Sequence, residues 1–281
     1  MRIAITGHKG QLGTSLTELL QAQHELLLID VPLFDITDRN NIGEAIAGFR
    51  PDCVIHTAAF TNVDGCARDP DRAYLVNALG AQNVALACQR VGAAMVFIST
   101  NEVFDGRASA PYLEFDHTNP INVYGRSKCA GELYTRMLLQ RFYIVRTAWL
   151  YAPQGNNFVE KIVRAADERG ELSVVTDEVS SPTYAPDLAL AVARLLTTDA
   201  FGIYHFTNAG ICSRYDFALE ILRQSGREHI PVRPITLAQY QRASTPPPYT
   251  PLRNFCGAAL GITLRPWQEA LSEYLTGRAN A

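Results

Sequence analysis

The chain has 281 residues, of which 47% are hydrophobic and 19% are charged, and its formal net charge is −3. This composition is typical of a soluble globular protein, and the length suffices for one large α/β domain with an attached lobe or for two small domains. There is no block of basic residues to support nucleic-acid binding, and no apolar run approaches the ~20 residues of a membrane span.

Short runs of β-branched and apolar residues alternate with helix-length segments through the first 177 residues. The predicted strands are Arg2–Thr6, Glu25–Asp30, Cys53–Ala58, Ala94–Thr100, Tyr143–Thr147 and Leu172–Thr176. The predicted helices are Leu12–Gln23, Arg39–Phe49, Pro70–Val91, Pro120–Gln140 and Phe158–Arg169. The strand runs are continuous rather than alternating, as in strands buried on both faces. This alternation predicts an α/β fold with a Rossmann-type, doubly wound parallel sheet, whose ligands bind where the strands end.

The pattern loosens after Asp177. It predicts a helix near Pro186–Leu196, a strand at Gly202–Phe206 and a helix near Tyr215–Gln224. Four prolines between residues 244 and 251 predict a loop, because proline fits neither a helix interior nor a central strand. We therefore expect a smaller C-terminal lobe that lies over the strand ends.

A glycine-rich loop, "TGHKGQLG", follows the first strand and opens the first helix. Gly7, Gly10 and Gly13 permit a tight turn, and the helix N-terminus that follows can receive a pyrophosphate. Asp30, which ends the second strand, can accept hydrogen bonds from the adenosine ribose and so favours NADH, whereas Lys9 in the loop can offset this for NADPH. The loop predicts a dinucleotide site and leaves the choice of cofactor open.

"NVYGRSK" places Tyr124 and Lys128 four residues apart, on one face of a predicted helix. A nearby ammonium favours the phenolate and brings the pKa of a tyrosine toward the working pH. Such a tyrosine can protonate an alkoxide as hydride reaches a carbonyl carbon. The same spacing is common on surface helices, so the pair gains its meaning from the dinucleotide loop upstream.

"ISTNEVFDG" sets Ser99, Thr100, Asn101 and Glu102 side by side where a buried strand stops. Either this is an ordinary exit from a strand or it is the floor of an active site. Six cysteines form no CxxC pair, which indicates reduced thiols rather than a disulfide or zinc framework, and no metal site is expected. The N-terminus enters a strand without a signal-peptide pattern, so a cytoplasmic protein is expected.

These motifs resemble the extended short-chain dehydrogenases/reductases, and within them the dTDP-4-dehydrorhamnose reductases. The resemblance spans nearly the whole chain and is carried by "GHKGQLG", "DITD", "HTAAFTNVD", "VNALGAQNVALAC", "STNEVFDG", "NPINVYGRSKCAGE", "RTAWLYAPQGNNF", "LSVVTDEVSSPTYAPDLA" and "GIYHFTNAG". It implies an NAD(P)-binding Rossmann domain at residues 1–150, to whose sheet the chain returns at about 172–177 and 202–206. It also implies a mainly substrate-binding lobe at residues 151–281.

The resemblance also implies the site residues. Tyr124 matches the proton donor, Lys128 the nicotinamide-ribose ligand, and Thr100 a hydrogen-bond donor to the substrate carbonyl. Together with Tyr124 and Lys128, the expected cofactor contacts are Gly7, Gly10, Gln11, Leu12, Gly13, Asp30, Asp35, Ile36, Ala58, Ala59, Phe60 and Thr61. The expected substrate contacts are Thr100, Asn101, Glu102, Trp149 and Arg253.

Two departures from the family pattern concern the substrate. The family usually reads "STDYVFDG", so here Asn101 replaces an aspartate and Glu102 a tyrosine. The arginine of the family's C-terminal loop is absent from "PPPYTPLRN", where Arg253 is offered in its place. We therefore expect intact chemistry with altered substrate contacts.

The expected function is reduction of a 4-keto-6-deoxy nucleotide sugar with NADH or NADPH, first of all dTDP-4-dehydrorhamnose. The alternatives are an NAD-dependent nucleotide-sugar epimerase or dehydratase and a non-catalytic NADP-binding regulatory subunit. The partner is the nucleotide sugar, with neither nucleic acid nor membrane, and a homodimer is left open.

Overall fold

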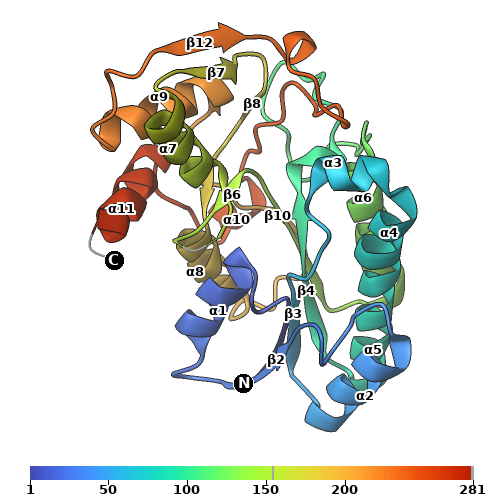
Figure 1. Cartoon of the computed structure of the whole chain (residues 1–281). Helices are drawn as coiled ribbons and strands as arrows, with labels where there is room; N and C mark the ends of the chain where they lie inside the picture. Colours follow the sequence, from blue (N-terminus) through green and yellow to red (C-terminus); the bar gives the residue numbers. More distant parts are fainter. Residues whose placement is uncertain (154, 280–281) are drawn as a thin grey trace.

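A six-stranded parallel sheet forms the centre of the molecule (Figure 1), seen in a computed structural model that describes residues 1–153 and 155–279. The strand order is β10-β5-β4-β3-β1-β2, and every neighbouring pair is parallel. The strands are β1 (Arg2–Thr6), β2 (Glu25–Ile29), β3 (Cys53–His56), β4 (Ala94–Thr100), β5 (Phe142–Thr147) and β10 (Gly202–His205). The predicted α/β fold with a doubly wound parallel sheet is confirmed.

Helices cover both faces of this sheet (Figure 1). One face carries α1 (Gln11–Leu20) and α8 (Ala185–Leu195); the other carries α2 (Arg39–Phe49), α4 (Pro70–Tyr74), α5 (Ala81–Val91) and α6 (Val123–Leu138). A π-helical segment, Leu75–Gly80, joins α4 to α5, so the single helix predicted at Pro70–Val91 is a composite. The short α3 (Val63–Arg68) follows β3, and a 3-10 turn (Asn101–Val103) follows β4.

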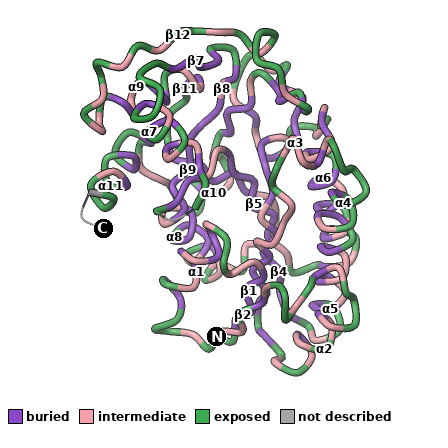
Figure 2. Tube along the Cα trace, in the orientation of Figure 1, coloured by how far each residue is buried: buried purple, intermediate pink, exposed green. Residues whose placement is uncertain are grey.

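The central strands are buried on both faces, which explains their continuous apolar runs (Figure 2). Ile3 and Ile5 pack into one cluster with Leu16 of α1 and Val192 of α8. Ala4, between them, belongs to a second cluster with residues of α2 and α5. Two apolar layers therefore fix the sheet, and the carboxyl ends of its strands are held at one edge.

A second lobe with its own core lies beside this edge (Figure 1). Its helices are α7 (Phe158–Arg169), α9 (Arg214–Gln224) and α11 (Trp267–Ala279), with a 3-10 turn at Leu237–Gln239, whereas the short α10 (Cys256–Ala259) packs against β10 of the main sheet. Its short strands are β6 (Leu150–Tyr151), β7 (Leu172–Val175), β8 (Val179–Ser180), β9 (Thr183–Tyr184), β11 (Cys212–Ser213) and β12 (Val232–Ile235). Phe217, Trp267 and Tyr274 lie at the centre of its core.

The predicted return of the chain to the main sheet is right at one place and wrong at the other. β10 pairs with β5 and becomes an edge strand of the six-stranded sheet. The strand expected at 172–177 is formed by β7, but β7 pairs with β12 in a separate two-stranded sheet. Leu172 and Val174 are buried in the core of the second lobe, so the apolar pattern is satisfied there. An apolar run predicts burial but does not say in which sheet.

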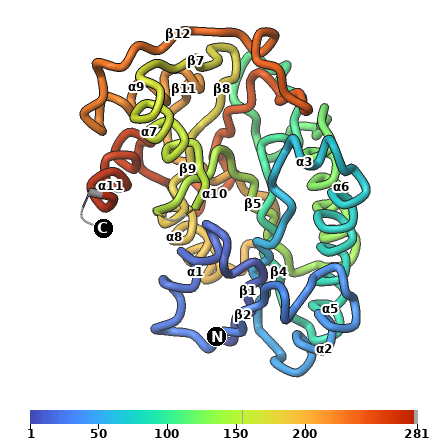
Figure 3. The backbone as a smooth tube through the Cα atoms, viewed as in Figure 1, coloured from blue at the N-terminus to red at the C-terminus, as the bar shows by residue number. Residues whose placement is uncertain are grey.

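The chain after β12 crosses back from the lobe to the sheet domain, toward α3 (Figure 3). Asp64 of α3 holds it, because its Oδ1 accepts from Arg242 Nε at 3.1 Å and from the backbone N–H of Ser244 at 3.0 Å. Asn122 Nδ2 donates to the carbonyl of Thr245 at 3.2 Å. We call residues 242–251 the strap.

Within the described residues, no helix is long and apolar enough to cross a membrane.

Candidate active site

A cavity of about 1410 Å³ opens at the carboxyl ends of β1 to β5 and extends to residues of the second lobe. It brings together most of the residues predicted from the sequence. Those that line it are Gly7, Gly10, Gln11, Leu12, Asp30, Asp35, Ile36, Ala58, Ala59, Phe60, Thr61, Thr100, Asn101, Glu102, Tyr124, Lys128 and Trp149. Ligand pockets for drug-sized molecules have ~300–1,000 Å³, so this cavity has room for a dinucleotide and part of a second ligand.

The glycine loop at one end of the cavity is packed so closely that side chains are excluded. Gly7 has φ +70°, and a Cβ there would lie 2.7 Å from the backbone of Ala58. A Cβ on Gly13 would collide with the carbonyl oxygen of Gly7. Gly13 does not line the cavity; its role is to let α1 begin directly against the turn.

The N-terminus of α1 faces this cavity, and the residues present fit a dinucleotide phosphate. Gly10 precedes the helix and provides no side-chain cap, so the first N–H groups stay available to an anion. The neighbouring Gln11 Oε1 is buried without a hydrogen-bond partner among the described residues, and as an acceptor it suits a hydroxyl of the cofactor rather than a phosphate oxygen. A phosphate at this helix end would meet N–H donors and the positive end of the helix dipole.

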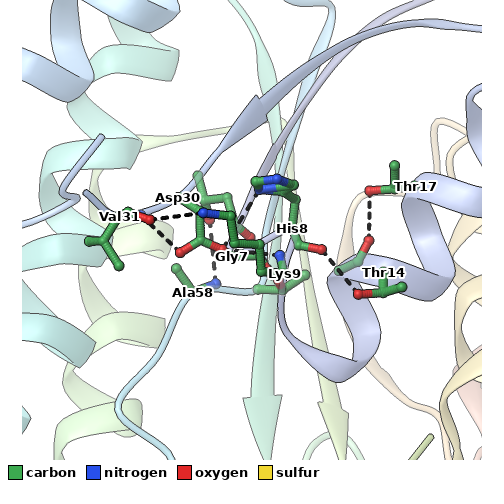
Figure 4. Close-up of polar contacts among 11 residues, drawn as sticks. Gly7, His8, Lys9, Thr14, Thr17, Asp30, Val31 and Ala58 are labelled. Carbon is green, nitrogen blue, oxygen red and sulfur yellow. Dashed lines mark hydrogen bonds and ion pairs between the residues drawn. The ribbon is translucent and has the colours of Figure 1, made fainter. Parts of the chain in front are cut away.

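Asp30 is held at the end of β2 by the glycine loop (Figure 4). Its Oδ2 accepts from the backbone N–H of Lys9 at 3.0 Å, and its Oδ1 accepts from Val31 N–H at 2.9 Å. Lys9 Nζ donates to the carbonyl of Val31, the residue after Asp30, at 3.1 Å. The structure therefore keeps together the two opposing signals for NADH and NADPH.

Tyr124 and Lys128 lie in the first turns of α6, whose start is capped by Asn122 through a 2.8 Å hydrogen bond from Gly125 N–H. Lys128 is 3% exposed; its Nζ donates to the carbonyl of Ile98 at 2.6 Å and lies 4.1 Å from the centre of the Phe97 ring. Burial lowers the pKa of Lys128 to about 7, against the opposing effect of the Glu132 carboxylate.

Tyr124 lies beside Thr100 and Glu102. Burial raises the pKa of the Tyr124 phenol, and the charge of Glu102 adds to this, while the Thr100 hydroxyl acts in the opposite direction. The expectation that Lys128 lowers the pKa of Tyr124 is therefore wrong for the free protein, because burial of the phenol outweighs it; the phenol is protonated at neutral pH and available as an acid. Thr100 is 5% exposed at the end of β4, and its Oγ1 accepts from the backbone N–H of Glu102 at 3.2 Å.

Asn101 connects the floor of the cavity to the second lobe. Its Nδ2 donates to Thr250 Oγ1 of the strap at 2.6 Å and to Ser180 Oγ of β8 at 3.4 Å, while its Oδ1 accepts from Thr100 Oγ1 at 3.2 Å. The side chain is 5% exposed. The side-chain amide of Asn101 therefore makes its hydrogen bonds within the protein, a structural role that the sequence did not indicate.

Glu102 lines the cavity and is held on one side only. Its Oε2 accepts from Asn122 Nδ2 at 2.6 Å, whereas Oε1 makes no hydrogen bond with any described residue. Burial raises the pKa of Glu102 to about 7, although the Asn122 hydrogen bond acts against this. A carboxyl group with this pKa is partly ionised at neutral pH and can accept or donate a proton.

Trp149 and Arg214 form the wall of the cavity on the side of the second lobe. Trp149 has φ +45°, a conformation that is strained for a bulky residue and that often marks a functional position. Arg214 stacks on the Trp149 ring at 3.7 Å and on Phe158 at 4.8 Å, and its Nε donates to Glu178 Oε1 at 3.0 Å. Arg214 lines the cavity, and sequence reasoning missed it because it begins a helix far along the chain.

The structure does not bring Arg253 to the cavity. Its side chain is exposed, and its guanidinium lies 5.6 Å from the ring centre of Phe255, away from the lining residues. Arg214 provides a cationic side chain at the cavity instead. Among residues 1–153 and 155–279, no three His, Cys, Asp or Glu side chains are grouped to hold a metal ion.

Comparison with known proteins identifies the family. The sequence profile described as RmlD substrate binding domain matches residues 1–279. The chain belongs to this family. It is 40% identical over 281 residues to the spore coat polysaccharide biosynthesis protein SpsK of Bacillus subtilis. This alignment covers all of this chain and 99% of SpsK.

Solved structures of the RmlD family agree over the whole fold. A dTDP-4-dehydrorhamnose reductase of Clostridium acetobutylicum is 41% identical with a TM-score of 0.95, over 98% of this chain and 99% of the other. The Bacillus anthracis dTDP-4-dehydrorhamnose reductase, solved in complex with NADP, is 39% identical with a TM-score of 0.95 over the same shares. The resemblance expected from the sequence is confirmed. The expected enzyme class, an oxidoreductase, and the expected Rossmann-type sheet are confirmed with it.

Proposed function

We propose that the chain is an NAD(P)H-dependent reductase of a 4-keto-6-deoxy nucleotide sugar, with dTDP-4-dehydrorhamnose as the first candidate substrate. The observation that carries this proposal is the grouping of Thr100, Tyr124 and Lys128 in the cavity that also contains the glycine loop. Relatives at 38–41% identity named dTDP-4-dehydrorhamnose reductase support the choice of substrate.

In this proposal each side chain has a defined task. A bound nicotinamide supplies hydride but no proton. Tyr124 donates its phenolic proton to the carbonyl oxygen as the alkoxide develops, and Thr100 donates a hydrogen bond to the same oxygen. Lys128 hydrogen-bonds the nicotinamide ribose, and its ammonium stabilises the phenolate that Tyr124 becomes. Burial of Lys128 and Thr100 keeps water from weakening these contacts.

The nucleotide sugar is proposed to enter from the side of the second lobe. Trp149 gives a flat apolar surface on which a sugar or a base can pack, and Arg214 offers a cation to the diphosphate. Arg214 is already oriented by Glu178 and by the two aromatic rings, so little side-chain entropy is lost on binding.

For the cofactor, both NADH and NADPH are proposed. The NADP found in the Bacillus anthracis relative supports NADPH. Asp30 can accept the ribose hydroxyls of NADH, while Lys9, bonded to Val31 beside it, can turn to a 2′-phosphate. The affinity for NADH depends on whether Asp30 keeps its bond to the Lys9 N–H, and the affinity for NADPH depends on whether Lys9 Nζ leaves the Val31 carbonyl.

Two other activities fit the fold. An epimerase or dehydratase would use the same cofactor without net consumption, and a regulatory subunit would bind it without turnover. The shared cavity of Tyr124, Lys128 and Thr100 supports a catalytic protein. A homodimer and a cytoplasmic location stay predictions.

The experiment that tests the proposal is a panel of keto-sugar nucleotides, each assayed with NADH and with NADPH. Steady oxidation of one cofactor with dTDP-4-dehydrorhamnose is the expected result. A changed sugar without net cofactor oxidation would instead indicate an epimerase or dehydratase. Cofactor binding without turnover on any sugar of the panel would indicate the regulatory alternative.

A further inference from the structure

Glu102 is an acid in the cavity to which the reduction assigns no step. It lies two residues after Thr100, and its backbone N–H is bonded to Thr100 Oγ1 at 3.2 Å. Its backbone also packs directly on α6, because a Cβ on Gly125, the residue after Tyr124, would collide with the carbonyl oxygen of Glu102. The Glu102 carboxyl group, the Tyr124 phenol and the Thr100 hydroxyl therefore border the same space.

The orientation of this carboxyl group leaves one oxygen for a ligand. Asn122 Nδ2 holds Oε2 at 2.6 Å, and the same Asn122 caps α6 and bonds the strap through Thr245. Oε1 has no hydrogen-bond partner among the described residues. The side-chain amide of Asn101, by contrast, already donates to Thr250 Oγ1 and to Ser180 Oγ, so both of its N–H groups are used within the protein.

A ketone held by Tyr124 and Thr100 has acidic hydrogens on the carbons next to its carbonyl. We propose that Glu102 is a further catalytic residue that removes and returns one of these hydrogens as a proton, so that the protein exchanges it with water. The inference rests on the proposed function, since it requires a keto sugar in the cavity. It adds an activity that consumes no cofactor.

The step balances within the groups named. The C–H bond breaks and its proton passes to Oε1 of Glu102, while the electron pair forms the carbon–carbon double bond of an enol. The carbonyl oxygen takes the proton of Tyr124, which is left as phenolate near Lys128. In the reverse direction Glu102 returns a proton, now exchanged with water, and Tyr124 regains its own. No oxidant or reductant takes part.

The charges around Glu102 suit a base that works near neutral pH. Burial raises the pKa of Glu102 to about 7, and a base is most effective when its pKa is near the working pH. The charged groups around it are Glu178, the residue before β8, which raises this pKa, and Arg242 of the strap and Arg214 of α9, which lower it. The nearby Cys66 thiol and Tyr124 phenol both have raised pKa values and are neutral at pH 7.

The test is deuterium exchange without reduction. The full-length protein is mixed with dTDP-4-dehydrorhamnose and NADP⁺ in D₂O, and mass spectrometry with proton NMR measures deuterium on the carbons beside the carbonyl. We expect exchange on the order of a hundredfold above the rate without protein, and a loss of about that factor in Glu102→Gln. Glu44→Gln, which removes an exposed carboxylate on α2 outside the cavity lining, should exchange like the wild type.

A pH series keeps the inference testable if the glutamine variant is unstable. Wild-type exchange should rise as the pH increases through about 7, because Glu102 must be ionised to accept a proton. Exchange at the wild-type rate in a folded Glu102→Gln would overturn the inference. A wild-type protein that reduces the sugar with NADPH but does not exchange would overturn it too, while leaving the proposed function intact. Failure of both reactions would overturn both.

Discussion

Lys128 should make the free energy of unfolding depend on pH, and replacing it by methionine should remove this dependence. Burial lowers the pKa of Lys128 from 10.5 in the unfolded chain to about 7 in the folded protein. Between these values the unfolded chain binds more protons than the folded protein, so stability rises with pH. The slope is at most about 1.4 kcal/mol per pH unit.

Because Lys128 is already half titrated near pH 7, the rise between pH 7 and pH 9 is about 2 kcal/mol. Lys128→Met also leaves the carbonyl of Ile98 without its donor, at a cost of about 1–3 kcal/mol. That cost is the same at both pH values, so it cancels when the two pH values are compared.

The assay is urea unfolding of the wild type and Lys128→Met at pH 7 and pH 9, without cofactor. The wild type should gain about 2 kcal/mol relative to the variant between the two pH values. Lys161→Met, which removes an exposed lysine of α7, should behave like the wild type. Equal pH dependence in the wild type and Lys128→Met would refute a buried Lys128 with a lowered pKa.

Three further predictions concern the cofactor, the proton and the strap. Tyr124→Phe should reduce turnover on the order of a hundredfold or more with cofactor affinity nearly unchanged; near-normal turnover would remove Tyr124 as the proton donor. Asp30→Ala should weaken NADH more than NADPH in a titration of each cofactor, and equal weakening would contradict its role at the ribose. Thr250→Val removes the partner of Asn101 and should cost about 1–3 kcal/mol in thermal or urea unfolding; an unchanged midpoint would mean that this contact does not tie the strap down.

Much of the fold follows from the sequence because the six-stranded sheet is buried on both faces. Ile3, Ala4 and Ile5 have to be apolar in succession, which sets β1 apart from an exposed strand. The same rule misplaced β7, because burial against the second lobe gives the same pattern as burial in the main sheet. The π-helical segment at Leu75–Gly80 was hidden for a related reason: one extra residue in a turn leaves the helical apolar pattern almost unchanged.

The site was predictable where local backbone geometry constrains the residue type. Gly7 and Gly13 have no room for a side chain, and that constraint is visible as a glycine spacing. Arg214 was not predictable, since its approach to Trp149 depends on how the second lobe packs against the sheet. Arg253 was assigned by position in the sequence, and an exposed loop residue gives no signal for the direction of its side chain.

The proposed reductase activity requires that hydride pass from the cofactor to the keto sugar, and isotope labelling follows this transfer. NADPH carrying deuterium at the transferable position of nicotinamide C4, in each of its two stereochemical forms, is incubated with the protein and dTDP-4-dehydrorhamnose, and the product is analysed by mass spectrometry and NMR. We expect one of the two forms to deliver a single deuterium to the carbon that bears the new hydroxyl, and Tyr124→Phe to slow this delivery. A product without deuterium from either form, or an altered sugar with the cofactor unoxidised, would contradict the proposed activity.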